Sequence, residues 1–275
     1  LYHLSANKYV GVLTGTLITA IIHSSSTMTI ILIGLLNSHL ISLYQATWIV
    51  LGANIGTTVT GLMIALDLGQ SAIYLCIIGF ILMFFKNKIT YWGRLLMALG
   101  LIFLAMDAMS LSLAPIQKST FFMNLFSQLN NPLIAILAGT LFTAIIQSST
   151  ASVGVLQTIY KKGLISFNMA TNVIYGQNIG TCITAFLSSI NGNPNAKRLS
   201  VIHVLINIIG TLVFVVASYF IPFVSFIENL TSNYSMQIAY MHTFFNLAST
   251  ILFLPFDSCL IYLAYKIIPI TKGEK

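Results

Sequence analysis

An internal duplication constrains the fold of this chain more than any other feature of its sequence. Residues 11–66 align with residues 135–190 without a gap, at an offset of 124 positions, and 22 of the 56 aligned positions are identical. The identities include "GT" at 15–16 and 139–140, "SS" at 24–25 and 148–149, and "NIGT" at 54–57 and 178–181. Shared hydrophobicity explains matched Leu and Ile, but it does not explain matched Ser, Asn, Gly and Thr. Each half of the chain therefore contains one copy of the same structural unit.

The matched polar residues lie within an apolar chain. Of its 275 residues 57% are hydrophobic and only 6% are charged, and the mean hydropathy is +0.93. Soluble domains carry about 25% charged residues. Because the apolar runs are also continuous rather than alternating, we expect an all-α polytopic protein of the cytoplasmic membrane. The net charge of +7 does not indicate nucleic-acid binding, since most Lys and Arg lie in short links between apolar runs.

Each copy of the repeat begins with two short apolar segments around a polar cluster. Residues 8–22 and 27–37 are each too short to span a bilayer comfortably, and His23 to Ser26 lie between them. Apolar segments of this length are typical of re-entrant structure. We therefore expect a re-entrant helical hairpin over about 8–37, with the polar cluster at its tip, and a second one over about 132–160.

Each hairpin is followed by an apolar stretch long enough to span the membrane, over residues 42–66 and 166–190. At about 1.5 Å per residue, Asn54 lies roughly 18 Å along the first of these helices, near the bilayer midplane. Glycines flank the asparagines in "GANIGTT" (52–58) and "GQNIGTC" (176–182). We expect these glycines to break both helices and free carbonyl oxygens. The alternative is a glycine-mediated crossing of tightly packed helices.

The remaining segments complete two inverted-topology repeats, residues 1–131 and 132–275. Further spans are expected at 70–86, 93–112, 197–221 and 236–266, with an interfacial amphipathic piece at 115–130. Three crossings separate the two hairpins, and this odd number makes the hairpins enter from opposite faces. Inverted repeats with broken helices are the architecture of secondary transporters.

Positive charges predict the orientation of the chain, because cytoplasmic loops are enriched in Lys and Arg. If the first hairpin enters from the cytoplasm, three basic residues lie outside: Lys118, Lys161 and Lys162. The inner side then holds nine: Lys8, Lys86, Lys88, Arg94, Lys197, Arg198, Lys266, Lys272 and Lys275. This orientation places the C-terminus in the cytoplasm.

The hairpin tips suit an anion. A helix that begins inside the membrane exposes backbone N–H groups and the positive end of its dipole. Hydroxyl donors add to these ends, namely Ser24, Ser25, Ser26, Ser148, Ser149 and Thr150. Two such tips would surround a small tetrahedral oxyanion. Since neither tip contains Lys or Arg, a co-transported cation would offset the anion's charge. The structural alternative is that these hydroxyls bond to helix carbonyls or ease helix packing.

Oxygen-bearing side chains of the two long helices suit a hard cation such as Na⁺. They are Asn54, Thr57, Gln177, Asn178 and Thr181. Two later motifs, "HVLIN" and "HTFFN", put His203 one turn from Asn207 and His242 one turn from Asn246. Without a nearby carboxylate they favour a hydrogen-bonding role behind the ligands over metal coordination.

Other classes of function stay open on these residues. An intramembrane serine hydrolase would use Ser24 or Ser148 as nucleophile and His203 or His242 as base. No G-x-S-x-G motif supports it, and a nucleophile does not need an inverted copy of itself. A channel or a membrane scaffold is also conceivable, although duplicated binding clusters in mid-membrane fit alternating access better.

The chain closely resembles the type II sodium/phosphate cotransporter family. "QSSTA" (147–151), "GQNIGT" (176–181) and "GANIGTT" (52–58) are similar to that family's paired motifs. "RLSVIHVLIN" (198–207) and "AYMHTFFNLASTILFLPF" (239–256) are similar to its later helices. His23 stands where the family has Gln. Set against the family pattern, the given sequence leads us to expect a missing or truncated first helix and no counterpart to the cytosolic domain of many bacterial relatives.

This resemblance implies a non-enzymatic symporter of inorganic phosphate, with Na⁺ as coupling ion and no cofactor. It implies phosphate at the two Ser-rich tips. It implies Na⁺ at the oxygen ligands above together with the residues that precede the tips, His23 and Gln147. Sulfate and arsenate remain alternative substrates, and a homo-oligomer is possible.

The inverted topology predicts which introduced cysteines a membrane-impermeant thiol reagent will reach. After replacement of the three native cysteines, Gly69→Cys and Asn233→Cys should be labelled from outside. Asn87→Cys and Gly192→Cys should be labelled only from the cytoplasm. Labelling of all four from one face would contradict the inverted arrangement.

Overall fold

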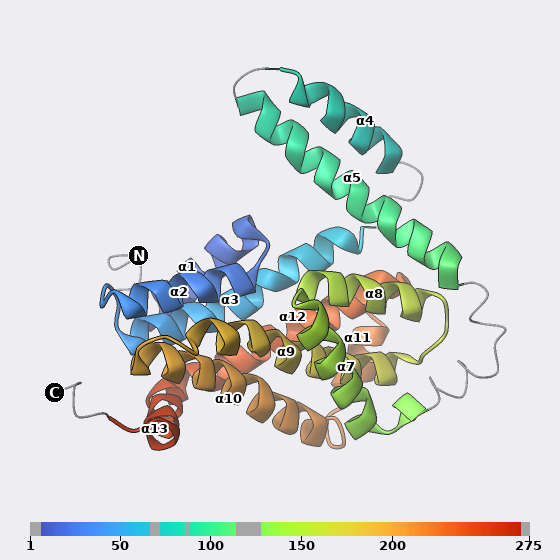
Figure 1. The fold of residues 1–275 in the computed structure, drawn as a ribbon. Coiled ribbons are helices and arrows are strands. Elements are labelled where there is room, and N and C mark those ends of the chain that lie inside the picture. The colour runs from blue at the N-terminus through green and yellow to red at the C-terminus, as the bar shows by residue number, and fades with distance from the viewer. Residues whose placement is uncertain (1–6, 67–71, 86–87, 114–127, 271–275) are drawn as a thin grey trace.

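The computed structural model describes residues 7–66, 72–85, 88–113 and 128–270, and it contains helices but no strand within these ranges (Figure 1). Much of the expected interfacial piece at 115–130 lies outside the described residues, and only the short helix η4 (Gln128–Asn130) represents it. The predicted all-helical architecture is therefore confirmed for the described part of the chain.

Each region predicted as a re-entrant hairpin contains a pair of short helices; that the pairs are re-entrant stays a prediction. The first consists of α1 (Lys8–Ile22) and α2 (Ser25–Asn37), and the second of α7 (Pro132–Ile146) and α8 (Ser149–Lys161). Each turn is made in the same way. His23 and Gln147 adopt a left-handed conformation, with φ of 58° and 57°, which non-glycine residues rarely do. The next residue, Ser24 or Ser148, caps the second helix by accepting a backbone N–H.

The long helices that follow, α3 (Leu43–Ile64) and α9 (Phe167–Ser189), are continuous. The predicted breaks at "GANIGTT" and "GQNIGTC" are therefore wrong. An unbroken helix satisfies its own backbone hydrogen bonds, which matters most where no water can replace them. The glycines have the alternative role, because they let the neighbouring helix approach closely.

The close approach joins the first arm of each hairpin to the long helix of the same repeat. A Cβ at Gly52 would lie 1.9 Å from the carbonyl oxygen of Val12, and one at Gly176 would lie 2.0 Å from that of Ile136. Threonine hydroxyls reinforce the same contacts: Thr16 and Thr140 each donate to a glycine carbonyl on the long helix, both at 3.1 Å. The two repeats thus share this contact residue by residue.

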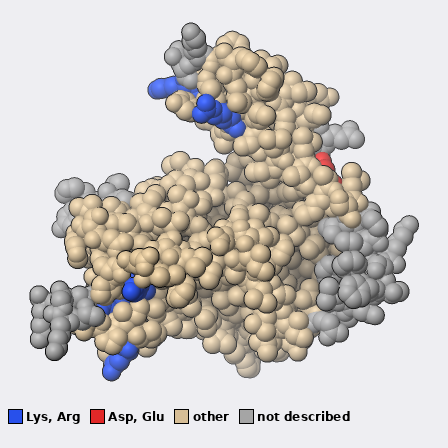
Figure 2. Space-filling model, in the orientation of Figure 1, with Lys and Arg blue, Asp and Glu red and all other residues tan. Residues whose placement is uncertain are grey.

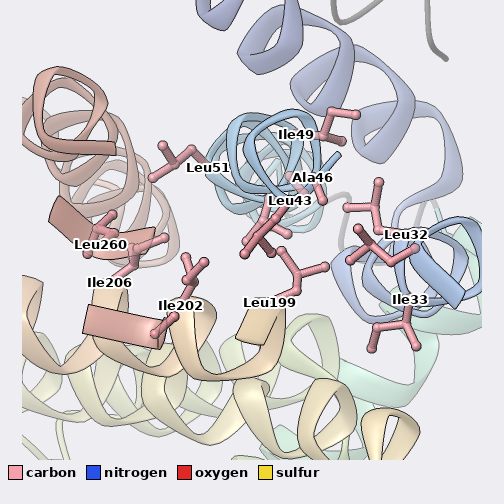
Figure 3. Packing of buried hydrophobic residues seen from close by; sticks show 14 of the residues in the cluster. Leu32, Ile33, Leu43, Ala46, Ile49, Leu51, Leu199, Ile202, Ile206 and Leu260 are labelled. Carbon is pink, nitrogen blue, oxygen red and sulfur yellow. The ribbon is translucent and has the colours of Figure 1, made fainter. Parts of the chain in front are cut away.

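The C-terminal helices pack around the two long helices. They are α10 (Pro194–Ala217), the short α11 (Phe223–Glu228), α12 (Tyr234–Phe253), η5 (Leu254–Phe256) and α13 (Asp257–Ile267). One apolar cluster joins α2, α3, α10 and α13 (Figure 3). A second, aromatic cluster holds α9, α10 and α12 together, with the Phe245 ring 5.0 Å from Tyr175 and 5.2 Å from Phe214.

Two helices pack mainly on each other, and the second of them also contacts α8. In Figure 1, α4 (Ala72–Met83) and α5 (Lys88–Leu113) form a pair that projects away from the other helices. Only 17% of the apolar window in α5 is buried. Figure 2 shows Lys and Arg near the end of this pair and near α13, with a broad uncharged surface between them. Lipid contact accounts for so much exposed apolar surface.

Four helical segments are long and apolar enough to cross a membrane: Leu43–Ile64, Lys88–Met109, Pro194–Ala217 and Tyr234–Ile267. They agree with four of the predicted spans. The span predicted at 70–86 corresponds to α4, which is too short at 12 residues. The one predicted at 166–190 corresponds to α9, which is long enough but less apolar than these four. The described chain is thus a multi-pass helical protein.

The glycine contact can be tested by adding a methyl group. Gly52→Ala and Gly176→Ala should each sharply lower the melting temperature and the yield of monodisperse protein in detergent, because overpacking typically costs about 1–3 kcal/mol and rigid backbone cannot give way. Gly34→Ala is the matched control, since no atom lies within 4 Å of its added Cβ. This control should be neutral or stabilising, as Ala favours a helix over Gly by about 1 kcal/mol. A parent-like melting temperature for Gly52→Ala would contradict the contact.

Candidate functional site

Five helices converge on one small polar cavity. Its volume is about 10 Å³, close to that of one water-sized sphere. The second arms of both hairpins, both long helices and α12 supply its lining: Ser25, Asn54, Thr57, Ser149, Asn178, Thr181 and His242. None of these seven side chains belongs to Lys, Arg, Asp or Glu.

The duplication accounts for six of the seven lining residues. They form three pairs 124 positions apart, Ser25 with Ser149, Asn54 with Asn178, and Thr57 with Thr181. All six were candidate ligands on the sequence alone. The fold thus brings hairpin residues and long-helix residues of both repeats to one place.

The other four hydroxyls of the predicted anion ligands lie elsewhere. Ser24 and Ser148 cap their helices, accepting the backbone N–H of Thr27 at 3.1 Å and of Ala151 at 3.2 Å. Ser26 accepts a hydrogen bond from Thr184 at 3.1 Å. Thr150 and Ser148 line a separate hollow of about 410 Å³ between α8 and α5. Of the six predicted hydroxyls, only Ser25 and Ser149 line the cavity.

Three of the predicted sodium ligands also lie outside the cavity. His23 is half-buried, with its Nδ1 2.9 Å from the Thr60 hydroxyl. Gln147 is exposed, and its side chain makes no hydrogen bond with any described residue. Gln177 is buried but donates to the backbone carbonyl of Ser152 at 2.9 Å and faces a hollow of about 190 Å³ within the second hairpin.

The two histidines of the later helices differ in position. His203 on α10 lies behind the cavity, and its Nε2 is 3.2 Å from Oδ1 of Asn54. Its neighbour Asn207 donates to the His203 backbone carbonyl at 2.9 Å. His242 on α12 lines the cavity itself, whereas the sequence predicted it behind the ligands. Because His242 lies outside the duplicated segment, the repeat alignment could not single it out; its only signal was the "HTFFN" motif.

The two threonines of the cavity bond within their own helices. The Thr57 hydroxyl donates to the carbonyl of Ala53 at 3.1 Å, and the Thr181 hydroxyl donates to the carbonyl of Gln177 at 2.9 Å. These are the back-bonds expected of threonine inside an apolar helix. They fix the hydroxyl hydrogens and leave oxygen lone pairs for the cavity.

Equivalent threonines of the two long helices both hold the first hairpin. Thr60 on α3 contacts His23, and Thr184 on α9 donates to Ser26. These threonines are themselves 124 positions apart. The first hairpin tip, residues 23–26, is thereby bonded to both repeats. The side chains of the second tip, residues 147–150, make no such bond to either long helix in the described part of the chain.

Several known proteins are similar to this chain in sequence. The chain is 31% identical over 254 residues to the uncharacterized protein YqeW of Bacillus subtilis, covering 91% of this chain and 82% of that protein. It is 30% identical over 248 residues to the putative inorganic phosphate export protein YjbB of Salmonella typhimurium, covering 87% of this chain but only 44% of that protein. Over 112 residues it is 31% identical to the human sodium-dependent phosphate transport protein 2B, covering 38% of this chain and 16% of that one.

No solved structure matches the chain. The sequence profile of the Na+/Pi-cotransporter family, in contrast, matches it twice, over residues 1–111 and over residues 106–230. Two successive matches agree with the internal duplication, and together they cover most of the chain. The chain belongs to the Na+/Pi-cotransporter family.

Proposed function

We propose that this protein is a Na⁺-coupled symporter of inorganic phosphate that works by alternating access. The observation that carries the proposal is the convergence of three duplicated residue pairs on one uncharged polar cavity. Membership of the Na+/Pi-cotransporter family and the phosphate-related names of several relatives support the choice of substrate.

The hairpin tips supply the groups that phosphate needs. Ser25 and Ser149 are the first residues of α2 and α8, so their hydroxyls lie at helix N-termini. Backbone N–H groups and the helix dipole attract an anion at that end. Each charge-assisted hydrogen bond contributes about 1.5–3 kcal/mol.

Na⁺ supplies the positive charge that the cavity lacks. The oxygens of Thr57, Thr181 and Asn178 suit a hard cation. Because His23, Gln147 and Gln177 lie outside the cavity, the ligand set proposed here is narrower than the one the sequence predicted. An inward Na⁺ gradient can drive phosphate uptake, since each net charge crossing 100 mV contributes about 2.3 kcal/mol.

The size of the cavity supports a conformational cycle. A volume of about 10 Å³ accommodates a sphere the size of a water molecule or a bare Na⁺, but not a tetrahedral oxyanion. Phosphate therefore requires a conformation in which the hairpin tips lie farther from the long helices. Re-entrant hairpins in inverted repeats would allow this opening alternately toward the two faces of the membrane.

The hydrolase alternative has less support. Its two candidate nucleophiles, Ser24 and Ser148, are engaged as helix caps and do not line the cavity with His242. A serine that accepts a backbone N–H at a helix start has an ordinary structural role.

Uptake of radiolabelled phosphate into proteoliposomes tests the proposal. We expect uptake with an inward Na⁺ gradient and little uptake when K⁺ replaces Na⁺. Ser25→Ala and Ser149→Ala should each weaken apparent phosphate affinity about tenfold to a hundredfold, from the loss of one hydrogen bond to a charged group. Ser38→Ala, at an exposed position after the same hairpin, is the matched control and should behave like the parent.

Several outcomes would contradict the proposal. Uptake independent of Na⁺ by folded protein would remove the coupling. Competition by sulfate as strong as that by phosphate would favour the broader oxyanion alternative. Phosphate efflux against a gradient, without Na⁺-driven uptake, would assign the export direction that the name of the Salmonella relative states.

A further inference from the structure

The two equivalent asparagines of the cavity are held by opposite ends of their amides. Oδ1 of Asn54 lies 3.2 Å from Nε2 of His203, on α10. Nδ2 of Asn178 instead donates to the carbonyl of Ile174, one turn earlier in α9, at 2.8 Å. Both asparagines line the cavity. Asn54 is therefore left with its NH₂ group for the cavity, and Asn178 is left with its Oδ1.

In the bond between His203 and Asn54, the amide oxygen of Asn54 determines which ring nitrogen carries the hydrogen. A carbonyl oxygen only accepts, so Nε2 of His203 carries the hydrogen. The other ring nitrogen, Nδ1, is buried and has no hydrogen-bond partner among the described residues. The opposite tautomer would bury an unpaired N–H there and would set two acceptors against each other, which is the more costly arrangement. Asn54 therefore keeps its NH₂ group for the cavity.

Asn178 has the reverse orientation. Its amide nitrogen is used within the helix, and its Oδ1 has no hydrogen-bond partner among the described residues. The ring of His242, although it lines the same cavity, makes no hydrogen bond to Asn178 within the described chain. Asn178 therefore offers the cavity a carbonyl oxygen.

Apart from His242, the other lining groups fall into the same two classes. Thr57 and Thr181 have donated their hydrogens to helix carbonyls and offer lone pairs. The hydroxyls of Ser25 and Ser149 are not engaged with any described residue and can donate. The cavity thus holds a donor set, Ser25, Ser149 and Asn54, and an acceptor set, Thr57, Thr181 and Asn178.

Anions bind to donors, and hard cations bind to oxygen acceptors. We infer that the duplicated asparagines have different ligands: Asn54 donates its amide hydrogens to the transported oxyanion, and Asn178 coordinates the coupling cation through its carbonyl oxygen. This inference rests on the proposed Na⁺-coupled phosphate transport. It also assigns His203 as a positioning residue, which holds the Asn54 amide in the orientation that binds an anion.

The same isosteric substitution at the two positions should have opposite effects. Asp retains the shape of Asn but replaces NH₂ with a second acceptor oxygen. Binding of radiolabelled Na⁺ and of radiolabelled phosphate at saturating Na⁺ would be measured separately on the full chain in detergent. Asn54→Asp should weaken phosphate binding at least a hundredfold and keep Na⁺ affinity within tenfold. Asn178→Asp should keep or tighten Na⁺ binding and leave phosphate affinity within tenfold.

Alanine variants keep the test decisive if an Asp variant does not fold. Asn54→Ala should weaken phosphate about tenfold to a hundredfold and spare Na⁺, and Asn178→Ala should do the reverse. For the positioning role, His203→Leu should weaken phosphate binding without changing Na⁺ affinity. His203→Gln should retain phosphate binding close to that of the parent, because the amide N–H of glutamine can replace the imidazole donor.

The outcomes separate this inference from the proposed function. If the parent binds phosphate in a Na⁺-dependent way but both asparagine positions affect the same ligand, the inference is wrong and the proposed function stands. The same holds if Asn54→Asp loses Na⁺ rather than phosphate. If the folded parent binds neither ion, both proposals are wrong.

Discussion

The backbone contact between the first arm of each hairpin and the following long helix determines where the six duplicated side chains of the cavity lie. At Gly52 and Gly176 the two helices touch through main-chain atoms, with no side chain between them. This contact fixes the height of the hairpin turn along the long helix. As a result the serine that begins the second arm lies level with the asparagine and threonine of the long helix. Two copies of that arrangement, facing each other, produce the cavity.

The chemistry of the cavity follows from its neutrality. An unpaired ionised side chain inside an apolar bundle would be costly, and the seven lining residues include no Lys, Arg, Asp or Glu. Donors and acceptors are available instead, and Thr57, Thr181 and Asn178 have part of their hydrogen bonding already satisfied by the helix that carries them. In a neutral site of this kind the proposed anion and cation would each offset the charge of the other.

Much of this site could be predicted from the duplication, because residues repeated at a fixed offset in an apolar chain have few other reasons to be polar. The continuity of α3 and α9 could not be predicted from the sequence, since glycines that flank an asparagine fit both a broken helix and a close helix crossing. His23 and Gln147 were predicted as Na⁺ ligands from the family resemblance. They instead form the left-handed turn, one residue before the helix cap. The orientation of Asn54 depends on His203, 149 positions away, which no local pattern encodes.

The threonines that hold the hairpin tips show how far the two copies have diverged. Thr60 and Thr184 occupy equivalent positions, yet both bond to the first hairpin, so that its tip is attached to both repeats. A hydrogen bond contributes about 0.5–1.5 kcal/mol net. The second hairpin is held beyond its tip instead, where Gln177 donates to the carbonyl of Ser152 at 2.9 Å and Gln157 donates to that of Gly61 at 3.1 Å. A chain built from two copies of one sequence unit thus attaches its two hairpins at different points, and the two tips need not detach with the same free energy.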